Sequence, residues 1–468
     1  MPNDSENLKL LVNGIGYDND VLVCGKHQKK VYRDLGVFRN VYNLMEDFAN
    51  SYKHITSDIE SRITPDIKKH VYEYVEYDRK LRARPIEFIN KAILHHYAFV
   101  ERIISENKYN FFYGEVGHLI TCLLLDIGKR YGVKILWPMM SFWPNRFFLS
   151  TGGKHALQKE IAKSYKYVKE NGIAEEEKKW AASYIDEFRN STPKTANVEC
   201  VESGNSKPTN SILPRNFNII RKARRAIELS INHNSYYKND YYGATMGDIL
   251  KGYLKPFIPN RYKYSIARYE KPVEGEKYIL FYLHYEPDLS TLVWAPYYKN
   301  QALFLRNLAF SIPYGYRLYV KEHPLMQNRP KGFYEEIERI PQVRLLASKE
   351  PHRALLTNCD LVLTITGTIG WEALLLGKPT IVFGNVFYNC FKGTIVLRDW
   401  EKLPGTITEL LNKKSIFTDE ELIRLVVAVK RFAVPGDWHA FTLPRYNKEN
   451  TEQLCESFRR KMLLESKK

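Results

Sequence analysis

Residues 360–379 read DLVLTITGTIGWEALLLGKP, and this stretch decides the fold of the C-terminal half of the chain. It predicts a buried strand, a short turn of small residues and the opening of a helix, and residues 380–383 (TIVF) predict a second strand. A strand, a helix and a strand in so few residues form a βαβ unit, which implies a parallel sheet. Ligands of such sheets bind beyond the carboxyl ends of the strands.

The turn between this strand and its helix is a candidate binding site. We expect the backbone N–H groups of Thr366, Gly367 and Thr368 to face a ligand, and the helix dipole favours an anion such as a phosphate. Glu372 follows one turn into the helix, where a carboxylate suits ribose hydroxyls better than phosphate. For this run alone, an ordinary βαβ turn with a solvated glutamate is an alternative of equal weight.

A second signal lies at the end of an upstream strand. Residues 316–320 (YRLYV) predict that strand, and KEHP follows at 321–324. If the strands are parallel, His323 lies on the same edge of the sheet as the turn, and Pro324 holds its backbone extended. Such a histidine can donate a hydrogen bond to a diphosphate oxygen or act as a general acid on a leaving phosphate.

A third apolar run, residues 278–283 (YILFYL), predicts a fully buried strand that opens this domain. The loop behind it carries His284, Glu286 and Asp288. These side chains either face the ligand or belong to a solvated loop, and for Glu286 the solvated position is the preferred interpretation.

The composition of the whole chain is that of a globular protein with an anionic partner. With 468 residues, 44% hydrophobic and 26% charged, we expect two or three folded domains. The net charge of +17 implies a nucleotide diphosphate, an acidic polymer, nucleic acid or an anionic membrane face as partner.

The six cysteines contain no C-x-x-C pair, which argues against a zinc site and a disulfide framework and fits a reducing compartment. No signal peptide and no apolar run of about 20 residues is apparent. We therefore expect a cytoplasmic protein, peripheral on the inner face of the cell membrane through its charge, with no metal and no cofactor.

Patterning along the chain predicts two Rossmann-like α/β domains that face a central cleft, with extra helices in the N-terminal one. The expected boundaries are an acceptor-side domain over 1–265 with a mobile insertion near 191–214, a nucleotide-sugar-binding domain over 272–432, and a tail with a helix over 433–468. In the first half, a strand at 110–113, a helix over 118–131 and a strand at 133–137 predict a second βαβ unit.

These motifs together resemble the GT-B glycosyltransferases, and the second half is similar to capsule polysaccharide biosynthesis proteins and related surface-polysaccharide transferases. The resemblance covers roughly residues 278–398 and rests on the motifs LHYEPDLST (283–291), VKEHP (320–324), TITGTIGWEAL (364–374) and GKP (377–379). Asp288 departs from the pattern, because relatives usually carry Glu there.

The resemblance implies roles for individual residues. His323 and the Thr366, Gly367 and Thr368 turn would contact the phosphates of a nucleotide-sugar donor, and Glu372 would hold its ribose. The donor-binding set expected from these motifs also includes two further residues, His284 and Lys321.

The catalytic base is expected in the first half. An inverting transferase needs a carboxylate or histidine to deprotonate the acceptor hydroxyl. Glu115, at a predicted strand end, is the first candidate, and His118, one turn away, is the alternative. Arg146 is a candidate contact for an acidic acceptor, with a surface arginine as the plainer interpretation.

We thus expect a glycosyltransferase that moves a sugar from a nucleotide-sugar donor to a saccharide or lipid-linked acceptor of a capsule-type polysaccharide or glycolipid. UDP-sugar 2-epimerases and glycerophosphotransferases share the fold and remain alternatives. A basic nucleic-acid-binding protein is disfavoured, because the chain lacks the aromatic-basic strands, helix-turn-helix signals and zinc spacings of that class.

Overall fold

The computed structural model describes residues 5–24, 26–114, 117–152, 155–190, 241, 264–326, 328–413, 416–438 and 447–467. Chain contacts divide the protein into two compact units. Unit 1 comprises residues 1–153, 196–257 and 434–468, and unit 2 comprises residues 154–195 and 258–433. Parallel strand pairs lie in both units, so the α/β fold class predicted from the sequence is confirmed.

Unit 2 is built on a six-stranded, fully parallel sheet. In chain order its strands are β6 (Tyr278–Tyr282), β7 (Arg317–Lys321), β8 (Val343–Leu346), β9 (Leu361–Thr364), β10 (Thr380–Val382) and β11 (Thr394–Val396). Their spatial order is β11-β10-β9-β6-β7-β8. This is the doubly wound 3-2-1-4-5-6 arrangement, whose ligand crevice opens at the carboxyl ends where the strand order reverses. Here that point lies between β6 and β9.

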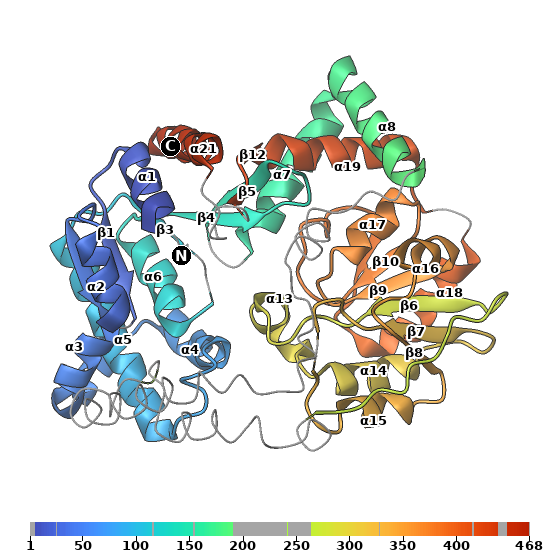
Figure 1. The fold of residues 1–468 in the computed structure, drawn as a ribbon, viewed down its shortest axis with the longest axis horizontal. Helices are drawn as coiled ribbons and strands as arrows, with labels where there is room; N and C mark the ends of the chain where they lie inside the picture. Colours follow the sequence, from blue (N-terminus) through green and yellow to red (C-terminus); the bar gives the residue numbers. More distant parts are fainter. Residues whose placement is uncertain are drawn as a thin grey trace, which may run out of the picture. The chain divides into compact units, whose positions relative to one another are not determined.

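Helices cover both faces of this sheet (Figure 1). Leu283 and alternate residues of β6 pack with α14 (Gln301–Ala309), α15 (Phe333–Glu338) and α18 (Leu403–Asn412). The intervening β6 residues pack with α16 (His352–Asn358) and α17 (Ile369–Leu375). Because both faces are buried, the strands are mainly apolar, which is why their alternation with helices was predictable.

Two long helices from the middle of the chain also belong to unit 2. These are α7 (Ala156–Asn171) and α8 (Glu175–Asn190), and both pack on α19 (Asp419–Phe432). Arg189 forms a bidentate pair with Asp419, at 2.6 and 2.8 Å. The sequence led us to expect these helices in the first half. The structure differs because contacts between distant segments, which leave no local pattern, hold them to the second half.

In the described part of unit 1, two small sheets lie among helices. β1 (Asp20–Val23) pairs in parallel with β2 (Asn40–Asn43). The predicted βαβ unit is confirmed as β3 (Phe111–Tyr113), α6 (Leu119–Arg130) and β4 (Lys134–Met140). β5 (Arg146–Thr151) adds antiparallel to β4, and β12 (Ala433–Pro435) lies beside it. The described residues of unit 1 also form the helices α1 (Ser5–Ile15), α2 (Lys26–Asp34), α3 (Leu44–Ser51), α4 (Pro65–Tyr77) and α5 (Ile86–Glu106), and the short 3-10 helices η1 (Tyr52–His54) and η2 (Ser57–Arg62).

The C-terminal helix, α21 (Lys448–Ser466), returns to unit 1 and packs on α1. Leu454 and Phe458 enter a core with Leu11 and Ile15. A Cβ on Gly14 would lie 2.4 Å from the Cys455 sulfur, so only glycine allows this close approach. The residues expected as a separate tail are therefore part of the first unit's core.

The insertion expected near 191–214 lies outside the described residues. Within the described part of the chain, no helix is both long and apolar enough to cross a membrane.

Candidate functional site

The switch point of the second sheet brings together two of the sequence motifs. β6 ends next to His284 and β9 ends next to Thr366, and these strands are neighbours. The Thr366 backbone N–H donates to Nε2 of His284 at 3.1 Å. His284 is 8% exposed, so its ring is a fixed, buried part of this edge.

The contact with Thr366 determines the tautomer of His284. Because Nε2 accepts a hydrogen bond, the ring proton of the neutral imidazole lies on Nδ1. Nδ1 is buried and has no partner among the described residues. Burial lowers the pKa of His284 to about 4, so the ring is neutral at physiological pH. His284 therefore carries a buried N–H donor that has no hydrogen-bond acceptor among the described residues.

His323 is fixed in the opposite tautomer. Its Nδ1 accepts the Leu325 backbone N–H at 3.2 Å, which leaves the proton on Nε2. Burial is also the main reason why the pKa of His323 is lowered. The charge of His323 in turn contributes to the lowered pKa of His284, as expected for two rings at the same edge. The sheet edge thus carries two neutral imidazoles, each with one nitrogen held by backbone and the other available to donate.

A buried ion pair holds the backbone behind both histidines. Glu322 and Arg329 are 1% and 0% exposed. Arg329 donates to both Glu322 oxygens, at 2.6 and 3.0 Å, and to the His284 carbonyl at 2.9 Å. Glu322 also accepts the His323 backbone N–H at 2.5 Å and the Tyr334 hydroxyl at 2.5 Å. One ion pair therefore fixes both histidine positions.

A second buried side chain, Gln301, fixes the loop after β6. Its Oε1 accepts the His284 backbone N–H at 2.7 Å, and its Nε2 donates to Glu286 at 2.5 Å. Burial raises the pKa of Glu286. The solvated position preferred for Glu286 is therefore wrong, because Gln301 and Arg329 draw it inward. Asp288 instead caps the one-turn helix α13 (Leu289–Leu292), accepting the Ser290 N–H at 3.2 Å.

The small-residue turn is tied to its own surroundings. Gly367 donates its N–H to the Thr364 hydroxyl at 2.8 Å and accepts the Tyr388 hydroxyl at 2.6 Å. The Thr366 N–H donates to His284. The expectation that the N–H groups of Thr366 and Gly367 face a ligand is therefore wrong, since neighbouring side chains already accept their hydrogen bonds. A Cβ on Gly367 would lie 2.7 Å from the Thr364 hydroxyl, so this tight turn requires glycine. Thr368, exposed at the start of α17, keeps its predicted place at the edge.

Glu372 and Lys321 lie toward the α16 side of the sheet. Glu372 is 7% exposed and contacts Nε2 of His352 at 2.5 Å, while Nδ1 of His352 contacts the Tyr282 hydroxyl at 2.8 Å. Lys321 donates to the Ser348 carbonyl at 2.5 Å, and burial lowers its pKa to about 8. His352 was not predicted from the sequence. Its one signal was the preceding proline, Pro351, at the start of the helix that follows β8.

The residues predicted on the acceptor side lie in unit 1. Glu115 falls outside the described residues. His118 precedes α6 with half of its side chain exposed, and its Nδ1 lies 3.9 Å from Asp78. Arg146 begins β5, half-buried, and its carbonyl accepts the Ser141 hydroxyl at 2.6 Å. Their proposed roles stay predictions.

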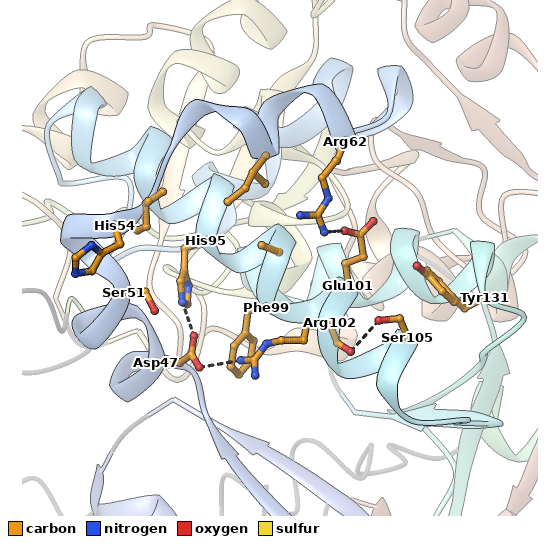
Figure 2. Close-up of a pocket in the computed structure, with 13 residues that line it drawn as sticks. Asp47, Ser51, His54, Arg62, His95, Phe99, Glu101, Arg102, Ser105 and Tyr131 are labelled. Carbon is orange, nitrogen blue, oxygen red and sulfur yellow. Dashed lines mark hydrogen bonds and ion pairs between the residues drawn. The ribbon is translucent and has the colours of Figure 1, made fainter.

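A pocket of about 760 Å³ opens in unit 1 beside α5 (Figure 2). Asp47 joins His95 at 2.8 Å and Arg102 at 2.9 Å, and Arg62 pairs with Glu101. This pocket was not predicted from the sequence. Its opposite charges neutralise one another, so they do not indicate a charged ligand.

Among the described residues, no group of three or more histidine, cysteine, aspartate or glutamate side chains is arranged to hold a metal ion.

Comparison with known families agrees with the motifs of the second sheet. Residues 231–394 match the family "Capsule polysaccharide biosynthesis protein", which is about a third of the chain. The capsule polysaccharide modification protein LipA of Neisseria meningitidis serogroup B is 36% identical over 72 residues, or 15% of this chain and 10% of LipA. Protein FixF of Sinorhizobium fredii is 30% identical over 182 residues, or 38% of this chain and 42% of FixF. The chain therefore spans less than half the length of these curated relatives.

Among solved structures, the Thermosulfurimonas dismutans KpsC β-Kdo 2,7 transferase aligns over 76% of this chain and 88% of its own, with 13% identity and a TM-score of 0.39. The UDP-GlcNAc 2-epimerase of Neisseria meningitidis aligns over 99% of this chain and 97% of its own, with 11% identity and a TM-score of 0.22. The family match confirms the resemblance to capsule polysaccharide biosynthesis proteins noted in the sequence, and the matched part of the chain is related to those proteins.

Proposed function

We propose that this protein is a glycosyltransferase of the GT-B type that transfers a sugar from a nucleotide-sugar donor to a surface-polysaccharide or glycolipid acceptor. The observation that carries the proposal is the pair of neutral imidazoles at the carboxyl edge of the second sheet. Each is fixed by a backbone hydrogen bond so that its other nitrogen is a donor. The family match over residues 231–394 supports a role in making capsule-type polysaccharide.

This geometry suits a leaving nucleotide. Negative charge grows on the phosphate as the bond to the sugar breaks, and the N–H groups of His284 and His323 are preorganised to meet it. Their low pKa values matter because a neutral ring donates without binding a proton from solvent first. The Glu322–Arg329 pair behind them keeps both donors in place.

Transfer also needs a base that takes the proton of the acceptor hydroxyl. Glu115 or His118 of unit 1 is proposed for that role, and Arg146 for contact with an acidic acceptor. The excess of Lys and Arg, +17 in net charge, supports a cytoplasmic enzyme that works on an acceptor held at an anionic membrane surface.

Nucleotide binding is the first test. Thermal-shift measurements with CMP, CDP, UDP and GDP should identify at least one nucleotide that raises the Tm, because a ligand that binds the native state stabilises it by mass action. The matching nucleotide sugars should then be consumed only when a saccharide acceptor is present. Interconversion of UDP-HexNAc without acceptor, read by NMR, would instead identify a 2-epimerase, and no nucleotide binding at all would contradict the proposal.

A further inference from the structure

Three side chains from separate parts of the second unit form one hydrogen-bonded row beside the proposed donor site. Tyr282 is the last residue of β6, His352 the first of α16, and Glu372 lies in the first turn of α17. The Tyr282 hydroxyl lies 2.8 Å from Nδ1 of His352, and Nε2 of His352 lies 2.5 Å from Glu372. We call these residues the Tyr–His–Glu row.

The carboxylate sets the direction of this row. A carboxylate only accepts hydrogen bonds, so Nε2 of His352 donates to Glu372. The neutral ring then accepts at Nδ1, and the Tyr282 hydroxyl donates to it. Burial, followed by the charge of Glu372, raises the pKa of Tyr282, which keeps the hydroxyl protonated as a donor. Both hydrogen bonds therefore run in the same direction, from the Tyr282 hydroxyl through His352 to Glu372.

The row uses only part of Glu372. His352 bonds one carboxylate oxygen, Oε2, and each carboxylate oxygen carries two acceptor sites. The carboxylate is 9% exposed, whereas the His352 side chain is 44% exposed, so the row reaches from the sheet edge to the surface. A carboxylate held from one side in this way is oriented before a ligand binds. The side chain then loses less conformational entropy on binding.

We propose that His352, oriented by Tyr282, is a positioning residue that aims Glu372 at a ribose hydroxyl of the donor nucleotide and so makes the site select ribonucleotides over deoxyribonucleotides. The inference rests on the proposed function, because it needs a nucleotide in this site. It adds two residues that the family motifs did not include, and it gives a role to a polar row beside the apolar core between the sheet and α16 and α17.

The test compares ribose with deoxyribose. The nucleotide that stabilises the protein most among CMP, CDP, UDP and GDP is titrated by calorimetry together with its 2′-deoxy and 3′-deoxy forms. For the wild type we expect one deoxy form to bind about 10- to 100-fold more weakly, the value of one hydrogen bond to a charged group. His352→Ala should reduce this preference to within about 3-fold, while the affinity for the deoxy form stays near that of the wild type.

Two conservative variants distinguish a positioning role of His352 from a purely structural one. His352→Gln keeps an N–H that can donate to Glu372 and should retain most of the ribose preference, whereas Tyr282→Phe should lose part of it. Tyr278→Phe is the matched control, because Tyr278 lies on the same strand and donates to the Leu355 carbonyl of the same helix. It should keep the preference of the wild type.

The outcomes distinguish this inference from the function on which it rests. Nucleotide binding without any preference for ribose in the wild type would overturn the role of the row and leave the proposed function standing. Equal loss of preference in Tyr278→Phe and Tyr282→Phe would show general loosening of the strand, which also overturns it. Absence of nucleotide binding would overturn both.

Discussion

Replacing Arg329 by methionine should destabilise unit 2 strongly, because it breaks a buried ion pair from one side. Arg329 is completely buried, and its loss removes two hydrogen bonds from Glu322 and one from the His284 carbonyl. The Glu322 carboxylate is then left buried with only the His323 N–H and the Tyr334 hydroxyl. Removing one partner of such a pair costs about 3–5 kcal/mol of unfolding free energy.

Hydrogen exchange of the β6, β7 and β9 amides, followed by mass spectrometry, measures this free energy locally. Arg344→Met is the control, since Arg344 pairs with Glu270 and Glu276 near the surface and should cost about 1 kcal/mol or less. The double variant Glu322→Gln/Arg329→Met should recover part of the loss, because it no longer leaves a buried charge. An Arg329→Met effect no larger than that of Arg344→Met would refute the idea that this pair holds the site.

Three further predictions concern the donor edge and the charge of the chain. His323→Ala should lower kcat/KM of sugar transfer by about 10²–10³-fold while nucleotide affinity falls far less, and a wild-type rate would remove His323 from the site. The pKa of His284 is about 4 in the native state and about 6.5 when unfolded, so the unfolded chain binds the extra proton between these values. The unfolding free energy should therefore fall by up to about 3 kcal/mol as the pH drops from 6.5 to 4, and urea titrations of His284→Gln should lack that part of the dependence. Binding to anionic vesicles should weaken steeply with added salt, and equal partitioning to neutral vesicles would leave the +17 without a membrane explanation.

The sequence predicted the parallel sheet of the second unit well because its strands are buried on both faces. Runs such as residues 278–283 and 361–363 are apolar without interruption, and short polar motifs follow their carboxyl ends. The parallel sheet implied by the βαβ unit placed His323 and Thr366 on one edge, with His284 in the loop after the first strand as a residue that could face the ligand. That part of the candidate site was visible before the structure.

The hydrogen-bond partners of these residues were not predictable. Whether the Thr366 N–H faces a ligand or the His284 ring depends on side-chain geometry across two strands, which no local pattern encodes. The same is true of the contacts that bring α7 and α8 to the second unit and α21 to the first. His352 could not be identified from the sequence because a single histidine at a helix start forms no recognisable motif. Its contact with Glu372 in the structure is what links it to the candidate site.

The central claim is that two neutral imidazoles, at the carboxyl ends of β6 and β7, donate to the phosphate of a bound nucleotide. NMR of protein labelled with ¹⁵N in its histidine rings tests this claim most directly, with His284→Gln and His323→Gln used to assign the signals. The account predicts a proton on Nδ1 of His284 and on Nε2 of His323, and both of these nitrogens should shift when the nucleotide is added. A nucleotide that binds and leaves both signals unchanged would contradict it.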